Sequence, residues 1–321
     1  RWPPAVSATV NPAPSVIETA GETDAALDAL VQKLRERYRG SVNDVLLSGS
    51  CLRGGDIFDG LVDLYLICDD YRSAYPRPAL AVANWLLPPN VFYTEIESGG
   101  RTLRTKFAVI SSADFRRGCS TRWFESYIWG RFAQPSGVVY CRDVSSREAL
   151  EQSLFLARRT FLQRALPRLP ATGTVMGLWE GAMALSYGTE LRSEGSGRPG
   201  ELAQASVAYF EDATRRLDGG LPFPFRVFEE DQRLFYRADI PQRTRTLAGI
   251  GWGLRRVQGK LMSFLRLFKA LFTFEGGIDY VAWKLQRHSG QEVVVPDRVR
   301  RYPLIFMWGF FWRLYRRGVF R

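Results

Sequence analysis

The chain has 321 residues and an apolar fraction of 46%, enough for one large domain or two of ordinary size with a real hydrophobic core. Its four cysteines show no Cys-x-x-Cys spacing and it has one histidine, His288, so a disulfide framework, a zinc site and Ser-His-Asp chemistry are not expected. The net charge of +11 lies entirely in the last quarter: residues 241–321 hold 16 Lys and Arg against 4 Asp and Glu, and the remainder is close to neutral. This asymmetry predicts a polyanionic partner for the last quarter alone.

The N-terminal part is predicted to be an extended leader followed by a helix. Residues 1–22 are rich in Pro, Ala and Thr. Residues 24–38 carry apolar side chains at helical spacing, with basic and acidic side chains between them. This helix leads into the first strand, which begins near Val45.

The most informative stretch follows that strand. The apolar run 45–47 ends at Ser48-Gly49-Ser50, and Asp63 comes thirteen residues after Ser50 inside a second apolar run. A strand, a Gly-Ser turn, a short helix and a second strand carrying a carboxylate form the core of a nucleotidyltransferase palm. Small residues let a backbone approach a phosphate closely, and the carboxylate holds Mg²⁺. An ordinary turn beside a buried structural acid is the alternative.

A second carboxylate is missing from this strand. Most such palms carry Asp-x-Asp there, whereas Leu61 stands two residues before Asp63. Asp56, Asp59 or an acid elsewhere in the chain would have to complete an active metal site.

The rest of the chain is predicted to alternate between strands and helices. Pro167 and Pro170 end a helical segment and mark a domain border. The predicted strands are 91–96 and 106–111, joined by a turn at 98–100, and 138–140; the predicted helices are 146–166, 178–191, 202–217 and 254–272, with a Gly/Ser/Pro loop at 193–200.

The C-terminal segment is aromatic and basic. Residues 302–312 are almost wholly apolar, with arginines on both sides, and this run is about half the ~20 residues that a bilayer-spanning helix needs. A short aromatic helix flanked by arginines suits insertion at the lipid headgroup level. The alternative is a helix packed on the protein or on a second subunit in a homodimer. Nucleic acid is not an expected partner, because its binders present aromatic side chains singly for stacking.

Several segments together resemble a known family over residues 45–285. They are Gly49-Ser50 with the strand around Asp63, Asp69-Asp70, the segments 91–93, 106–111 and 127–135, Leu185-Ser186-Tyr187 with Glu190 and Arg192, and the segment 269–277. In this order they resemble the mitochondrial-type phosphatidate cytidylyltransferases, the translocator assembly and maintenance (TAM) proteins, which have bacterial relatives.

The resemblance implies an α+β fold. A nucleotidyltransferase domain with a polymerase-β-like mixed sheet (residues 23–166) would precede a mostly helical, winged-helix-like domain (167–290), and the basic aromatic membrane-associating tail would be residues 291–321. The implied reaction joins CTP to phosphatidic acid, giving CDP-diacylglycerol and pyrophosphate in phospholipid biosynthesis, with Mg²⁺ as cofactor. The implied location is peripheral, on the cytoplasmic face of a bacterial inner membrane, or alternatively on the matrix side of the mitochondrial inner membrane.

The expected metal ligands are Asp63 and Glu190, although Glu190 is equally suited to pair with Arg192 or another arginine. Gly49 and Ser50 are expected to cradle the triphosphate. Because the acceptor phosphate is already ionised, positioning and charge neutralisation are expected to lower most of the barrier.

The remaining site residues each have two interpretations. Lys106 is either a phosphate contact or a solvated strand end, Arg131 a phosphate contact or a structural cap, and Tyr187 a nucleotide contact or a core residue. Arg266 and Lys269 bind the triphosphate or lipid headgroup, as Arg192 would, or belong to a solvated helix face. A nucleotidyltransferase with another acceptor or nucleotide, and a non-catalytic membrane-bound module, are the alternatives to the lipid enzyme.

Overall fold

The fold was analysed in a computed structural model, which describes residues 22–49, 51, 56–190, 200, 204, 206–273, 286, 293–301 and 303–316. Residues 1–21, Ser50, Arg192 and His288 lie outside the described residues, as does most of the loop predicted at 193–200. All four cysteines are free thiols, as their spacing predicted.

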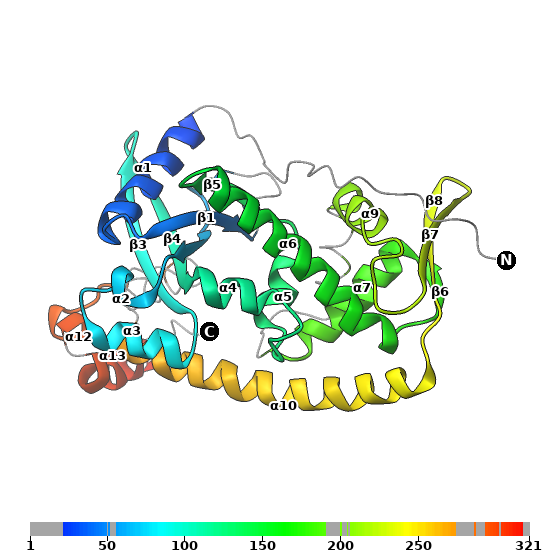
Figure 1. Ribbon diagram of the computed structural model, residues 1–321. Coiled ribbons are helices and arrows are strands. Elements are labelled where there is room, and N and C mark those ends of the chain that lie inside the picture. Colours follow the sequence, from blue (N-terminus) through cyan, green and yellow to red (C-terminus); the bar gives the residue numbers. More distant parts are fainter. Residues whose placement is uncertain are drawn as a thin grey trace.

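A five-stranded mixed sheet forms the left half of the molecule in Figure 1. Its strand order is β3-β4-β2-β1-β5, in which β2 and β4 are parallel and the other neighbours are antiparallel. The strands are β1 (Val42–Ser48), β2 (Val62–Cys68), β3 (Asn90–Ser98), β4 (Arg101–Ser111) and β5 (Gly137–Cys141). This sheet confirms an α+β fold and the predicted strands, including the hairpin that turns at residues 99 and 100.

Both faces of the sheet are covered, because neighbouring residues on a strand point to opposite faces. Val45 and Leu64 belong to the apolar cluster that packs under α1 (Glu22–Arg37), whereas Leu46 and Tyr65 belong to the cluster on the other face. The remaining helices of this half are α2 (Tyr71–Ala74), α3 (Pro78–Leu86), α4 (Ser112–Gly118), α5 (Tyr127–Phe132) and α6 (Val144–Ala165).

A second, smaller sheet stands at the other end of the molecule (Figure 1). It contains β6 (Thr172–Thr174), β8 (Arg233–Ala238) and β7 (Phe225–Glu230) in that order, beside α7 (Val175–Tyr187) and α9 (Val207–Arg215), and a 3-10 turn at Leu166–Arg168 precedes it. Trp179 of α7 donates a hydrogen bond to Thr214 of α9 at 2.8 Å. One apolar cluster runs from Leu46 of the first sheet to Phe225 of the second. The domain borders and the winged-helix description stay predictions.

Helix α10 (Gln242–Thr273) spans the length of the molecule along its lower side in Figure 1. It begins twelve residues before the predicted start at Leu254, because three glycines at positions 249, 251 and 253 made this part of the sequence a poor helix prediction. Burial of Trp252 compensates for their low propensity, and its indole nitrogen donates to the Arg164 carbonyl at 2.8 Å.

The C-terminal segment contains α12 (Asp297–Arg301) and α13 (Pro303–Arg316), which confirms the predicted aromatic helix. Trp308 and Trp312 are exposed, whereas Phe310 is buried. Among the helices described, none combines the length and the apolar character that crossing a bilayer requires.

Asp44 is a buried acid in β1, near the end of the strand that is remote from Ser48. Burial raises its pKa to about 6; a hydrogen bond with Cys141 opposes this rise, Asp143 adds to it and Arg142 opposes it. The folded state therefore binds a proton at the Asp44 carboxyl group more tightly than the unfolded chain does. The contribution of protonated Asp44 to folding stability is complete below about pH 4 and is lost as the pH rises through about 6.

We expect Asp44→Asn to remove this loss. The free energy of unfolding of the variant relative to the parent should be unchanged near pH 4 and higher by about 1–2 kcal/mol at pH 8. Urea denaturation of both proteins at pH 4, 6 and 8 measures the difference. Equal stabilities at pH 8 would show that the Asp44 carboxylate is well solvated.

Candidate active site

The register of three strands brings the predicted site together. Ser48, the last residue of β1, pairs with Asp63 of β2, and Asp63 in turn pairs with Lys106 of β4. The bend after β1 and a lysine on β4 therefore flank the carboxylate from opposite sides. The sequence placed these residues in the correct strands.

Gly49 lies directly against Asp63. Its φ of +92° falls in a region that other residues rarely adopt, and a Cβ at this position would stand 2.9 Å from Asp63 Oδ2. Only glycine therefore permits this close approach of the bend to the carboxylate. Ser50, the second residue expected to cradle the triphosphate, lies outside the described residues.

The Asp63 carboxylate forms an ion pair with Lys106, but the oxygen that faces the lysine accepts no hydrogen bond. Lys106 Nζ lies 3.3 Å from Asp63 Oδ1, with the lysine side chain 37% exposed and the aspartate side chain 27% exposed. Oδ1 is nevertheless buried and makes no hydrogen bond, because the ammonium group is near it but poorly aligned. Lys106 is thus a partner of the carboxylate, not an isolated solvated strand end.

Arg131 of α5 supplies a second cation. Its Nη1 donates to Ser48 Oγ at 3.2 Å, and its guanidinium carbon lies 5.4 Å from the Tyr65 ring centroid. Facing Tyr65 raises the arginine pKa against the opposing effect of burial, and Tyr127, Asp63 and Glu190 raise it further. The guanidinium therefore stays charged where it binds Ser48 at the bend.

Glu190 and Tyr187 follow from the end of α7. The backbone nitrogen of Glu190 donates to the Tyr187 carbonyl at 3.1 Å, and Tyr187 Oη donates to Gln134 Oε1 at 3.4 Å. Gly259 of α10 packs closely against the adjacent Thr189, because a Cβ at this glycine would stand only 2.3 Å from the Thr189 carbonyl oxygen. Both Glu190 and Tyr187 are half-buried.

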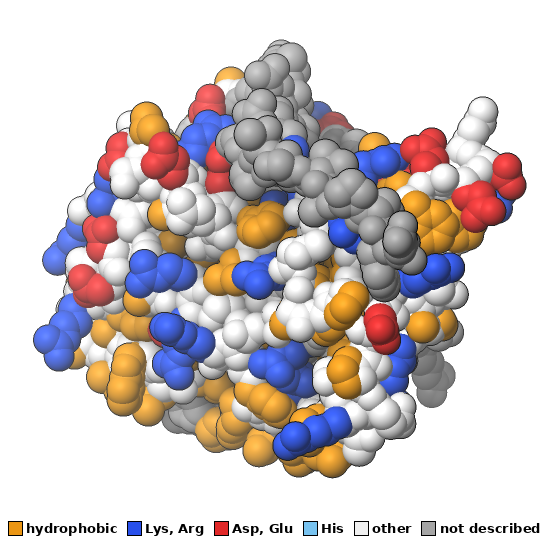
Figure 2. Space-filling view, turned by 45° about the vertical axis from the view of Figure 1, so that its right-hand side comes forward, with side chains coloured by type: hydrophobic (Ala, Val, Ile, Leu, Met, Phe, Trp, Pro, Cys, Tyr) orange, Lys and Arg blue, Asp and Glu red, His pale blue; other side chains and the backbone are white. Residues whose placement is uncertain are grey.

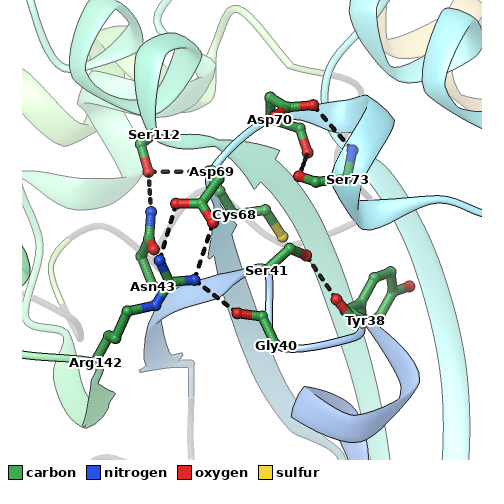
Figure 3. Close-up of polar contacts among 10 residues, drawn as sticks. All are labelled: Tyr38, Gly40, Ser41, Asn43, Cys68, Asp69, Asp70, Ser73, Ser112 and Arg142. Atoms are coloured by element: carbon green, nitrogen blue, oxygen red, sulfur yellow. Dashed lines mark hydrogen bonds and ion pairs between the residues drawn. The ribbon is translucent and has the colours of Figure 1, made fainter.

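The acids nearest in sequence to Asp63 have other roles. Asp69 binds the Arg142 guanidinium at 3.0 and 3.1 Å, and Asp70 accepts from two backbone nitrogens at the start of α2. Figure 3 shows the Asp69–Arg142 pair and the contacts of Asp70 with Ser73. They lie beyond the end of β2 that is remote from Asp63, at a separation of about 20 Å for six residues of strand. Asp56 and Asp59 both pair with Arg101 at the turn between β3 and β4. Within the described residues, no three Asp, Glu, His or Cys side chains are grouped to hold a metal.

Arg266 and Lys269 point into the protein. Arg266 binds both oxygens of the buried Glu125 at 2.6 and 2.7 Å and stacks over Tyr127. Lys269 donates to the carbonyls of Leu87 and, at 2.9 Å, Pro89, and burial next to Arg266 lowers its pKa to about 7. The solvated helix face considered for these two residues is therefore wrong. Their protein contacts also give no support to phosphate binding. Arg192 lies outside the described residues.

Sequence reasoning missed three residues of the site. Ser48 is the arginine's partner, and the Tyr65 and Tyr127 hydroxyls lie 3.2 Å apart behind Arg131. Tyr65 carries a usable signal, because it stands two residues after Asp63 and so shares its face of β2. Ser48 was predicted as part of the bend and Tyr127 as part of the segment 127–135, but their contacts with Arg131 and Tyr65 were not predicted.

Comparisons with known proteins give little further information. No family model matches the chain, and no curated protein matches it. Among solved structures, the chain is similar to a nucleotidyltransferase-like protein from Exiguobacterium sibiricum, with 11% sequence identity over 77% of this chain and 79% of that one. The TM-score of this match is 0.26.

Proposed function

We propose that this protein is a Mg²⁺-dependent nucleotidyltransferase that joins CTP to phosphatidic acid, giving CDP-diacylglycerol and pyrophosphate. The observation that carries the proposal is the contact of the Gly49 bend with Asp63, flanked by Lys106 and Arg131. A phosphate seated at the bend would meet a carboxylate that can hold a cation and two positive side chains. The choice of cytosine and of a lipid acceptor follows from the family resemblance alone.

The residues present fit a magnesium ion held mainly by its substrate. Mg²⁺ typically uses one or two protein carboxylates together with water and substrate phosphates. Oδ1 of Asp63 accepts no hydrogen bond and could bind the ion in place of Lys106, and Glu190 is the proposed second carboxylate. Bound there, the ion would neutralise charge on the triphosphate.

The chain's own side chains would do the remaining work. Gly49 and Ser50 would seat the triphosphate, and Tyr187 would contact the nucleotide. Lys106 and Arg131 would stabilise negative charge as an oxygen of the lipid phosphate attacks the α-phosphorus and the bond to the β-phosphate oxygen breaks, releasing pyrophosphate. No proton has to be removed from an ionised phosphate, so no general base is assigned.

We further propose peripheral attachment to an anionic membrane, on the cytoplasmic face of a bacterial inner membrane. Support comes from α13, where Trp308 and Trp312 are exposed beside the exposed basic residues Arg313 and Arg316. Amphipathic aromatic rings favour the headgroup region, and each nearby basic residue adds about 1 kcal/mol on an anionic surface.

Incubation with α-labelled CTP, Mg²⁺ and phosphatidic acid in mixed micelles tests the reaction. We expect label in a lipid product and release of pyrophosphate, with ATP, GTP and UTP as base controls and diacylglycerol as a control acceptor that lacks the phosphate. Transfer to another acceptor or from another nucleotide would retain the nucleotidyltransferase and refute the lipid specificity. Nucleotide binding without transfer would identify a non-catalytic module. The ion pair between Lys106 and Asp63, the proposed metal ligand, would then explain why no transfer occurs.

A further inference from the structure

The outward face of α10 is a continuous apolar seam. Its members recur at alternating steps of three and four residues, which places them on one side of the helix over about 30 Å. The α10 seam consists of Leu247, Ile250, Leu254, Val257, Leu261, Phe264 and Phe268, each of which is between 52 and 71% exposed. Isolated exposed apolar residues are ordinary, but a continuous stripe of this length indicates a binding surface.

Helix α3 adds two exposed apolar side chains beside α10. A cavity of about 530 Å³ lies between the two helices, with Trp85 and Leu86 of α3 in its wall opposite Gln258 and Met262 of α10. Trp85 and Leu86 are 69 and 67% exposed.

Exposed charge on this face is mainly positive. The 32 residues of α10 include seven Lys and Arg and no Asp or Glu, and of these Arg255, Arg266 and Lys269 point into the protein. Arg243, Arg256 and Lys260 are exposed beside the seam, and Arg117 and Arg122 are exposed at the cavity. Figure 2 shows orange and blue side chains along the lower margin of the molecule, where α10 runs in Figure 1.

The acids in the cavity wall are already engaged. Asp114 accepts a hydrogen bond from the Tyr71 hydroxyl at 2.7 Å, and Glu125 binds Arg266. Glu125 is therefore compensated within the protein, whereas Asp114 keeps its charge and is outnumbered at the cavity by Arg117 and Arg122.

These observations favour a lipid surface over a second copy of the chain. Pairing two α10 seams would place exposed basic residues of both copies near one another with no acid on either helix to compensate. An anionic bilayer complements the charge, and its interface accepts Trp, Phe and Leu side chains.

We propose that the α10 seam, together with Trp85 and Leu86, lies on an anionic lipid bilayer with the helix axis parallel to the surface. This docking surface is separate from the C-terminal tail, and the inference does not depend on the proposed reaction. Lys and Arg stems beside the seam would reach lipid phosphates while the apolar side chains enter the boundary with the acyl chains.

Vesicle sedimentation tests the proposal. We expect the full chain to bind vesicles of phosphatidylcholine with 30% phosphatidylglycerol at least tenfold more strongly than vesicles of phosphatidylcholine alone. Leu254→Glu/Leu261→Glu should lower the partition coefficient at least tenfold, and Arg256→Glu/Lys260→Glu should do so on the anionic vesicles only. All four side chains are exposed, so the thermal unfolding of both variants should match that of the parent.

Two controls make the result specific. Val144→Glu replaces an apolar residue at the start of α6 that is even more exposed than Leu254 and Leu261, and it should leave vesicle binding unchanged. Asp63→Ala should bind vesicles like the parent, which separates this inference from failure of the proposed reaction. Undiminished binding by Leu254→Glu/Leu261→Glu would overturn the proposal. So would a change from dimer to monomer in that variant, measured by analytical ultracentrifugation, without loss of vesicle binding.

Discussion

Replacing Asp63 with alanine is expected to lower the rate of nucleotidyl transfer by about a thousandfold or more. The carboxylate is the proposed anchor of the metal ion, and a bound divalent ion contributes several kcal/mol of charge stabilisation in the transition state. The fold should survive, because the side chain is partly exposed and Lys106, its ion-pair partner, can be hydrated when left alone. Transfer of label from CTP and the thermal unfolding midpoint measure the two effects.

Asp59→Ala is the matched control. Asp59 is an acid four residues earlier, on the connection that precedes β2, but its side chain is 79% exposed and its contact with Arg101 is 3.4 Å long. Activity of this variant should stay within a factor of two or three of the parent. Retained activity in Asp63→Ala would exclude the site described here, whatever the enzyme's acceptor proved to be.

Replacing Arg266 with methionine is expected to cost about 3–5 kcal/mol of folding stability. The guanidinium and the Glu125 carboxylate are 12 and 8% exposed, and they bind through two short contacts. Removing one member of a buried pair leaves an uncompensated charge, which is far more costly than the net value of the pair. Urea denaturation of parent and variant gives the difference in the free energy of unfolding.

Two further variants test whether the unpaired Glu125 carboxylate causes this loss of stability. Arg256→Met changes an exposed arginine on the same helix and should alter stability by less than about 0.5 kcal/mol. Glu125→Leu combined with Arg266→Met should recover much of the loss, because no buried charge remains. A cost below about 1 kcal/mol for Arg266→Met alone would mean that water reaches Glu125 readily.

Local patterns predicted the frame of the active site well. Short apolar runs identified the strands around Val45, Asp63 and Lys106, and a glycine beside a carboxylate-bearing strand marked the bend. These features depend on neighbours in sequence or on adjacent strands. The roles of Ser48 and Tyr127 could not be predicted, because each is defined by a partner on a distant element, Arg131 and Tyr65 respectively.

The orientation of α10 shows where periodicity stops being informative. A 3.6-residue pattern separates an apolar face from a basic one, but it does not say which face meets the protein. Here Arg255, Arg266 and Lys269 face inward, since backbone carbonyls at Phe124 and at residues 87–89 offer acceptors for their donors. Those acceptors lie more than a hundred residues earlier in the chain, beyond the reach of any local pattern.

The late position of α10 in the chain also has a consequence for biosynthesis. The carbonyls that its arginines and lysine will bind belong to loops translated long before the helix, so water must solvate them while the nascent polypeptide is still attached to the ribosome. We expect the first 241 residues to gain protection from protease only when α10 has emerged from the exit tunnel. Completion of the tertiary structure would then coincide with the appearance of the segment proposed to meet the lipid, and a newly made molecule would become rigid and membrane-competent in the same step.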